Sequence, residues 1–254
     1  MAAIVNAIYR YPVKGLSGES LDRVDLTPGQ CLPGDRRFAV AHGSVRFRDG
    51  NPHWMEKRSF LMLAKDEKLA QLRVQFDDAD ETLTVMRDGK AVVTAKASEA
   101  MGRMLIGQFF ASFMAASLRG AAKFVAAEGV NFTDVPEKYL SIINLASVAD
   151  LERVARQPAD PLRFRGNLYL KGLAPWAEAE WIGRTLSIGD LRLEVVQPIG
   201  RCAATNVNPE TAERDMNIPL TLRKGFGHMN MGVYARVVEG GSLNRGSAVE
   251  LAAP

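Results

Sequence analysis

The stretch Pro198-Ile199-Gly200-Arg201-Cys202-Ala203-Ala204-Thr205-Asn206 follows the run Leu191-Arg192-Leu193-Glu194-Val195-Val196. Apolar residues alternate in that run, which predicts a strand with Cys202 just beyond its end. A thiol at a strand end, beside a guanidinium that favours thiolate, is typical of a cysteine that ligates a soft metal or acts as a nucleophile. A lone cysteine is also often a small buried hydrophobe. The rest of the sequence has to decide between these roles.

Strand-like stretches lie on both sides of this segment and predict a β-rich α+β protein. In the first half they span residues 4–11, 37–41, 69–76, 82–87 and 91–95, with Asp88-Gly89 as a hairpin turn. In the second half they span residues 122–126, 139–143, 163–170, 185–188, 191–196, 232–238 and 247–251. Residues 98–118, rich in Ala, Met, Leu and Phe, predict a helix between the halves. We therefore divide the chain into an N-terminal β module (1–97), a connecting helix (98–121) and a second, barrel-like β domain (122–254).

The run Ser147-Val148-Ala149-Asp150 has the serine and the later acidic residue of a helix N-cap box. It predicts a helix that begins at Ser147, with an inward stripe that includes Val148 and Leu151. The start of a helix carries free N–H groups and a partial positive charge, so this helix end is also suited to receive a phosphate.

Composition excludes several classes of protein. The 254 residues are 47% hydrophobic, and 32 basic against 29 acidic residues give a net charge of +3 without a basic run, which argues against nucleic-acid binding. Two cysteines in a chain of this length indicate reduced thiols and a cytoplasmic protein. The start of the chain lacks the pattern of a secretory signal. The uncharged residues 104–118 are too short to span a bilayer, so we expect a core helix and no membrane partner.

Motif searches exclude the common metal and nucleotide sites. The three histidines, His42, His53 and His228, lack the close spacing of a zinc site. Two separated cysteines cannot build an iron–sulfur cluster, which needs about four ligands. No glycine fingerprint for a nucleotide or flavin follows a strand. Any redox centre of this chain is therefore expected to use Cys202.

Three separated cations stand beside glycine or proline at predicted strand ends. Lys14, Arg36 and Arg165 are placed as loop residues that reach toward an anion, although each of them is equally compatible with a solvated surface charge. Asn167 follows Arg165 by two residues, on the same side of an extended chain, and is expected to share its contact. Its alternative role is a hydrogen bond at a strand edge.

Four short motifs in series resemble the MOSC proteins, named for the C-terminal domain of molybdenum cofactor sulfurase, and among them most closely the amidoxime-reducing branch and its bacterial relatives. The motifs are Tyr11-Pro12-Val13-Lys14-Gly15, Gly34-Asp35-Arg36-Arg37-Phe38, Phe164-Arg165-Gly166-Asn167-Leu168 and Arg201-Cys202. The resemblance covers nearly the whole chain and implies a MOSC-type β module followed by a MOSC domain. Mitochondrial members carry a membrane anchor before the first motif; with ten residues ahead of Tyr11, we expect none here.

The resemblance implies a molybdopterin-type molybdenum cofactor. It assigns the thiolate ligand of the metal, and the catalytic role, to Cys202, while Cys31 stays structural. Gly15 stands where many relatives have serine, which removes one hydroxyl contact. The residues implied to bind the cofactor are Lys14, Gly15, Arg36, Ser147, Arg165, Asn167 and Arg201.

The function implied is an oxidoreductase that reduces small N-hydroxylated or N-oxide compounds. Its electrons must come from a separate donor, such as a ferredoxin-like, cytochrome-type or flavin reductase protein, because the chain has no second redox signature. The alternative is a sulfur-carrier or cofactor-delivery protein in which Cys202 bears a persulfide. A third possibility is a binding domain whose partner performs the chemistry. We also expect residues 216–232 to form either a loop at the rim of the substrate site or a plain solvent-exposed loop.

Overall fold

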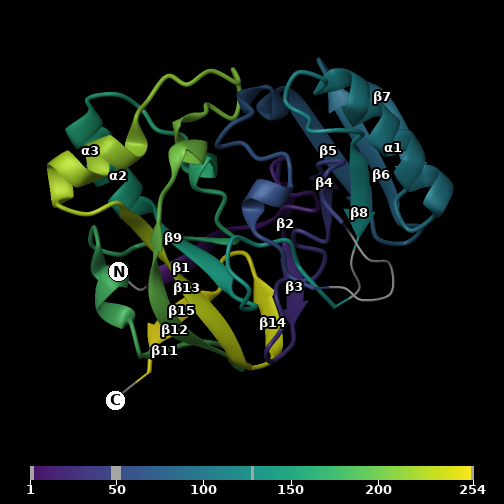
Figure 1. Ribbon diagram of the computed structural model, residues 1–254. Helices are drawn as coiled ribbons and strands as arrows, with labels where there is room; N and C mark the ends of the chain where they lie inside the picture. Colours follow the sequence, from purple (N-terminus) through teal and green to yellow (C-terminus); the bar gives the residue numbers. More distant parts are fainter. Residues whose placement is uncertain (1–2, 47–52, 127–128, 253–254) are drawn as a thin grey trace.

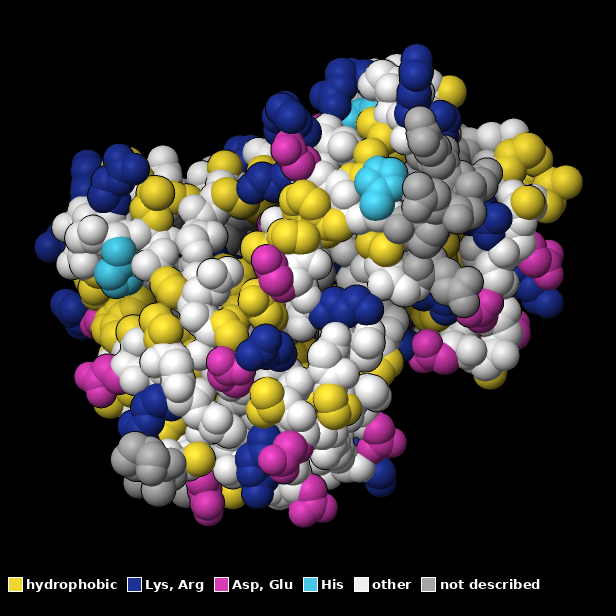
Figure 2. Space-filling model, turned by 60° about the horizontal axis from the view of Figure 1, so that its bottom comes forward, with side chains coloured by type: hydrophobic (Ala, Val, Ile, Leu, Met, Phe, Trp, Pro, Cys, Tyr) yellow, Lys and Arg dark blue, Asp and Glu magenta, His cyan; other side chains and the backbone are white. Residues whose placement is uncertain are grey.

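Figure 1 shows the chain as a computed structural model that describes residues 3–46, 53–126 and 129–252. The described residues are rich in strands and include three α-helices: α1 (Ala100–Phe113), α2 (Leu145–Ala155) and α3 (Ile218–Phe226). The predicted β-rich α+β class is therefore confirmed. Over the face drawn in Figure 2, basic and acidic side chains are interspersed, as the balanced composition suggests.

Seven strands close into a barrel. Around the barrel they run β10 (Leu168–Lys171), β9 (Leu140–Asn144), β13 (Asn230–Glu239), β12 (Leu191–Gly200), β11 (Thr185–Ile188), β15 (Ala248–Leu251) and β1 (Ala3–Arg10), which pairs again with β10. Alternate residues of each strand point inward, as Leu191, Leu193 and Val195 do in β12, and form one buried apolar cluster. Because the sheet is closed, each of the seven barrel strands has a neighbour on both sides. One additional strand, β2 (Glu19–Leu21), pairs with the last residues of β1.

The first strand belongs to this barrel. β1 pairs with β10 and β15, which come from the second half of the chain, and its Val5 and Ile8 are fully buried in the barrel cluster. The sequence placed residues 4–11 in a separate N-terminal β module. Alternation predicted the strand correctly, but it carries no information about which strand lies beside it. The division at residues 97 and 122 itself stays a prediction.

A smaller β region lies beside the barrel (Figure 1). Its strands form a pair, β4 (Phe38–Ala41) with β8 (Lys123–Ala126), and a three-stranded sheet of β5 (Leu72–Asp77), β6 (Thr82–Arg87) and β7 (Lys90–Lys96). Asp88 and Gly89 form the predicted hairpin turn, both with positive φ. A further pair, β3 (Arg23–Leu26) with β14 (Gly241–Asn244), was not predicted.

Helix α1 lies within the predicted range 98–118 and packs on β7 and β8. Ile106 and Phe110 are fully buried against the second apolar cluster, whereas Met101, Met104 and Leu105 are exposed. The expected core helix is thus a surface helix with one buried face. No helix among the described residues has both the length and the hydropathy to cross a bilayer.

Two further expectations about local structure were wrong. The strand predicted over 163–170 begins only at Leu168, as β10; before it, Pro161–Phe164 form a 3₁₀ turn, because the Asp160 side chain accepts a hydrogen bond from Leu162 N and Pro161 fits the first turn of a helix. In place of a loop over 216–232, Asn217 caps helix α3, which ends at Gly227 with φ of 79°. Asn217, Pro219 and Gly227 were signals for a helix that the apolar pattern did not make obvious.

Candidate functional site

A cavity of about 350 Å³ opens where the end of β12 meets the loops of the smaller β region. It is lined by all but one of the residues that the sequence singled out, although they come from distant parts of the chain. These are Lys14, Gly15, Arg36, Arg165, Asn167, Arg201 and Cys202. Ser147 is the predicted residue that does not line it.

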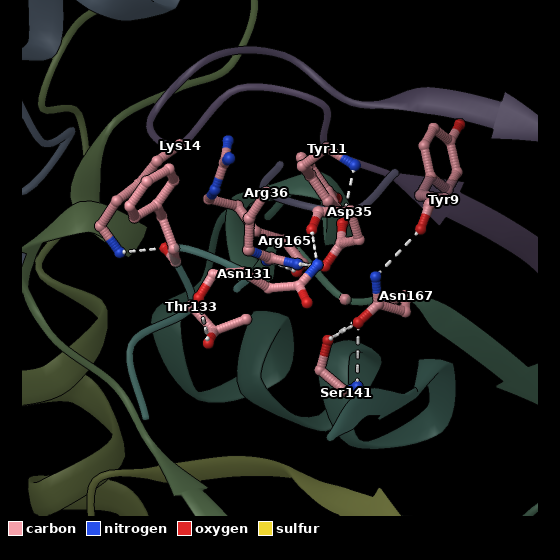
Figure 3. A network of polar contacts seen from close by, with 12 residues as sticks. Tyr9, Tyr11, Lys14, Asp35, Arg36, Asn131, Thr133, Ser141, Arg165 and Asn167 are labelled. Atoms are coloured by element: carbon pink, nitrogen blue, oxygen red, sulfur yellow. Dashed lines mark hydrogen bonds and ion pairs between the residues drawn. The ribbon is translucent and has the colours of Figure 1, made fainter. Parts of the chain in front are cut away.

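The buried ring of Tyr11 lies between two arginines (Figure 3). The guanidinium carbons of Arg165 and Arg36 lie 4.3 Å and 4.8 Å from its centroid, within the range of cation–π attraction. Asp35 accepts a hydrogen bond from Tyr11 N at 2.8 Å and forms an ion pair with Arg36. Burial alone would lower the pKa of Arg36, but the Asp35 carboxylate outweighs burial and raises it. Arg36 is therefore a fixed positive charge.

Arg165 retains unused hydrogen-bonding capacity. Its Nη1 donates to Leu16 O at 2.5 Å, while its Nη2 is buried and has no hydrogen-bond partner among the described residues. Burial, together with the charge of Arg36, lowers the pKa of Arg165. A buried guanidinium nitrogen without an acceptor is costly, and it is the feature expected where an anion supplies that acceptor.

Asn167 reaches the cavity for a different reason than the one we expected. Arg165 has φ of 51°, so the chain is not extended between the two residues and the alternation argument fails. The Asn167 amide is held by its neighbours: its oxygen accepts from Ser141 N and Oγ, and its nitrogen donates to Tyr9 O at 3.2 Å. Figure 3 shows this bridge between strands. Asn167 shapes one wall of the cavity.

Lys14 brings a third cation to the cavity, beside Arg36 and Arg165. Its ammonium donates to Phe132 O at 2.8 Å and to Asp134 Oδ1 at 2.6 Å. Burial lowers the pKa of Lys14, and Arg36 and Arg165 lower it further, against the attraction of Asp134. Burial would raise the pKa of Asp134, but Lys14 outweighs burial and holds it at about 2. The sequence gave no motif for Asp134.

Replacing Asp134 with asparagine is expected to make stability less dependent on acid pH. Since the pKa of folded Asp134 is depressed to about 2, its contribution is complete above its unfolded pKa of about 3.9 and is lost as the pH falls toward 2. The free energy of unfolding in urea, measured from about pH 5 down to pH 2, should show the largest difference between wild type and Asp134→Asn at the upper end. Asp190→Asn, in an exposed turn, is the control. Parallel curves for wild type and Asp134→Asn would refute a native Lys14–Asp134 pair.

Gly15 is required by the backbone. Its φ is 84°, and an added Cβ would lie 3.3 Å from Leu69 Cδ1 and 3.4 Å from Leu61 O. A side chain at this position is therefore both strained and crowded. Gly15 therefore contributes only backbone atoms to the lining of the cavity.

Cys202 is the thiol that lines the cavity. It is half-buried and precedes a 3₁₀ turn, Ala203–Asn206, in which Thr205 N and Oγ1 both donate to Cys202 O. Cys31 is buried elsewhere, and burial raises its pKa to about 12. The structure thus separates a thiol facing the cavity from a structural one.

Arg201 lines the cavity, and its guanidinium is engaged by main-chain carbonyls. Its guanidinium donates to Met231 O, at 2.8 Å from Nε, and to Phe164 O at 2.9 Å from Nη1. Burial lowers its pKa to about 10. These bonds connect the end of β12 to β13 and to the turn before Arg165, so Arg201 holds the segment that carries Cys202 in place.

Ser147 does not cap helix α2. The helix begins at Leu145, and Asn144 is its N-cap, accepting from Ala146 N at 3.0 Å. Ser147 is fully buried inside the first turn and donates to the Glu178 carboxylate at 2.8 Å. The sequence misplaced the helix start because Asn144, which ends β9, is an equally good capping residue. Ser147 is therefore not available to a ligand in the cavity.

Arg163 was missed by the sequence analysis and also lines the cavity. Its Nη1 donates to Asn206 O at 3.1 Å and its Nη2 to Asp215 Oδ2 at 2.6 Å, while its buried Nε has no hydrogen-bond partner among the described residues. Tyr11 and Asp35, also missed, stand inside two of the quoted motifs. No group of three or more His, Cys, Asp or Glu residues is arranged to hold a metal ion in the described ranges.

Fold and site together define a class of protein: a closed β-barrel with a smaller β region, in which one cavity joins a thiol to buried cations. The family models for the MOSC domain and the MOSC N-terminal beta barrel domain match residues 129–250 and 2–123, respectively. The chain therefore belongs to the MOSC-domain family, as its motifs predicted.

Among curated proteins, molybdenum cofactor sulfurase of Caenorhabditis briggsae is 27% identical over 247 residues, which are 93% of this chain and 34% of the relative. The Caenorhabditis elegans protein of that name is 26% identical over 92% of this chain and 33% of its own length. Human mitochondrial amidoxime-reducing component 1 is 33% identical over 85 residues, which are 34% of this chain and 25% of that protein. The chain spans about a third, or less, of the length of these relatives.

Two solved structures that match the chain have lower sequence identity to it than these curated proteins. The match to the YuaD protein of Bacillus subtilis covers 99% of this chain and 96% of that chain, at 11% identity and with a TM-score of 0.46. The match to YiiM of Geobacillus stearothermophilus covers 45% of this chain and 54% of that chain, at 20% identity and with a TM-score of 0.36.

Proposed function

We propose that this chain binds a molybdopterin-type molybdenum cofactor in the cavity and reduces N-hydroxylated or N-oxide compounds with electrons from a separate donor. One observation carries the proposal. The half-buried thiol of Cys202 shares a cavity with Arg165, whose buried Nη2 has no partner among the described residues. A ligand with a soft metal at one end and an anionic group at the other matches this donor set.

The residues of the cavity divide the binding between them. Arg165 and Arg36 would hold the anionic end, with guanidinium groups that are already oriented by Leu16 O, Asp35 and the Tyr11 ring. Lys14 adds positive charge, and an anion beside it would oppose the lowering of its pKa. Cys202 would provide the thiolate ligand. Ser147, which the resemblance implied, has no part in this proposal.

When bound, the cofactor would supply the two-electron redox chemistry for removal of the substrate oxygen. The overall reaction converts an N-hydroxyl compound, two electrons and two protons into the reduced nitrogen compound and water. Tyr234 lines the cavity, and burial raises the pKa of its hydroxyl, so that it keeps its proton and acts as a neutral hydrogen-bond donor. Enclosure by the two β regions limits access of water, which strengthens each charge interaction inside.

The proposal predicts that the cofactor-loaded protein is inactive with NADH alone and active with reduced viologen. The reason is the inventory of the chain: two cysteines cannot build a cluster, and no glycine loop for a flavin or nicotinamide is present. Turnover of an N-hydroxylated amidine would be measured with each reductant. Equal rates with NADH and viologen would reveal a nucleotide site and contradict the proposal.

A sulfur-carrier function is the second candidate, because the molybdenum cofactor sulfurases match 92% or more of this chain. In this case Cys202 would carry a persulfide. Protein from a host that makes the cofactor would be analysed for metal and for sulfane sulfur. Stoichiometric molybdenum with pterin supports the reductase, whereas a Cys202 persulfide without metal supports the carrier. A cytoplasmic location stays a prediction for either function.

A further inference from the structure

The outer side of the Cys202 segment is covered by the α2–α3 end of the molecule, and the cavity lies on its inner side. Helix α3 packs on the turn that follows Cys202, and Ile218 N donates to Asn206 Oδ1 at 3.0 Å. Arg201 N donates to Met229 O at 2.8 Å. None of the residues 216–232 lines the cavity, so the expected substrate rim is in fact an outer surface.

This outer surface carries an apolar cluster. The rings of Trp176, Phe226 and His228 lie together, with centroids 4.4 Å apart for Trp176 and Phe226 and 5.4 Å apart for Trp176 and His228. Each of these rings is partly exposed. Leu220, one turn before Lys224 on α3, and Met229, whose Sδ lies 3.5 Å from Arg223 Nη2, are exposed by 41% and 39%. Partly exposed aromatic and methionine side chains within a polar rim are typical of a protein interaction site.

The rim of the cluster is basic. Arg223 and Lys224 are exposed in the last turn of α3, and the sequence has no acidic residue from position 216 to 238. The last turn of α2 lies alongside, since a Cβ on Gly225 would come within 2.7 Å of Val154 Cγ1. That turn adds the exposed Arg153 and Arg156. In Figure 2 the lobe that bears α3 shows dark-blue side chains around hydrophobic ones and a histidine.

The acidic groups of α2 are engaged within the protein. Asp150 accepts from Trp176 Nε1 at 2.7 Å and pairs with Arg153 at 2.8 Å. Glu152 accepts from Ala159 N at 2.8 Å. Since Asp150 takes up Arg153, the exposed cations that the two helices offer to a partner are Arg156, Arg223 and Lys224, and the complementary surface is acidic.

We propose that the surface formed by Trp176, Leu220, Arg223, Lys224, Phe226 and Met229 is the docking site of a small acidic one-electron carrier protein. This inference rests on the proposed function, which needs electrons from outside the chain. A protein cannot enter a cavity of 350 Å³, so a carrier must approach from outside, as close to Cys202 as possible. This surface is joined to the Cys202 segment through Met229 and Asn206. Two reduced carriers, docking in turn, deliver the two electrons of one turnover.

The test compares two doubly charge-reversed variants. Arg223→Glu/Lys224→Glu changes the docking surface, and Lys90→Glu/Lys123→Glu makes the same change of net charge in the smaller β region. Wild type and both variants would be loaded with cofactor and assayed with a reduced plant-type [2Fe–2S] ferredoxin and, separately, with reduced viologen. We expect the KM for ferredoxin to rise about tenfold or more in the first variant only, with the viologen-driven rate unchanged.

Binding is read out independently of turnover by carbodiimide cross-linking, which joins ferredoxin carboxylates to lysines. Lys224 should be the linked residue, and added salt should abolish the link. Cross-links spread over other lysines, or equal ferredoxin KM values for both variants, would overturn the docking site. So would specific binding of anionic phospholipid vesicles at these residues in place of ferredoxin. Loss of viologen-driven activity in loaded wild type would instead refute the reductase function, while the cross-link still reports on the surface.

Discussion

Cys202→Ser is expected to abolish reduction of N-hydroxylated substrates with reduced viologen, whereas Cys31→Ser is expected to retain most of it. Cys202 is the half-buried thiol of the cavity, and a serine oxygen is a poor ligand for a soft metal. Cys31 is buried away from the cavity with a pKa raised to about 12, so its thiol is inert. Removing an outer-shell partner of a metal ligand costs about 10- to 100-fold in activity, and loss of the ligand itself should exceed that.

The measurement is the rate per bound molybdenum, with the metal content determined for each preparation. Thermal unfolding of both variants controls for damage to the fold, because either side chain has packed neighbours. Equal rates for Cys202→Ser and Cys31→Ser, at equal metal content, would remove Cys202 from the metal site.

Arg165→Ala should lose most of the bound pterin, and Arg165→Lys should lose less. Alanine removes both the bond to Leu16 O and the unpartnered Nη2, whereas lysine keeps the charge but cannot make both contacts at once. A hydrogen bond to a charged group contributes about 1.5–3 kcal/mol, which corresponds to an affinity roughly 10- to 100-fold weaker for the alanine variant.

Pterin released on denaturation would be quantified per mole of protein. Arg23→Ala, at an exposed ion pair on β3, is the matched control and should retain the cofactor. If the pterin content of Arg165→Ala equals that of Arg23→Ala, Arg165 does not hold the cofactor, and its unpartnered nitrogen needs another explanation.

Much of the candidate site was predictable because cofactor chemistry limits the residue types. Lys14, Arg36, Arg165 and Cys202 stand in short motifs with glycine or proline, and the structure brings all four to one cavity. The roles of Arg201 and Asn167 were not predictable in this way. Their side chains are engaged by main-chain groups of distant segments, Met231 O and Phe164 O for Arg201, and Ser141 N and Tyr9 O for Asn167. A sequence shows a donor or an acceptor, but not whether the fold has already supplied its partner.

Ser147 and Asp134 illustrate this limit in opposite ways, because the sequence singled out Ser147 and missed Asp134. Ser147 matched a capping pattern, yet Asn144 caps the helix and Glu178 takes up the serine hydroxyl. Asp134 matched no pattern, yet it is the partner of Lys14. The Asn144 cap is local, but Glu178 and Asp134 are acidic side chains brought to their partners from 31 and 120 residues away, which local propensity does not register.

By itself the sequence determined the β-rich class, most strand positions, the family, and the identity of the one thiol with a functional setting, because alternation, turn chemistry and residue type are local properties. The tertiary structure alone decided that β1 completes the barrel, that Arg36 and Arg165 both lie against the Tyr11 ring, and that one nitrogen of Arg165 has no partner among the described residues. It also placed α3 and its basic surface behind Cys202. These outcomes depend on which segments meet across long stretches of chain, and that is settled by the burial of the whole set of apolar faces at once.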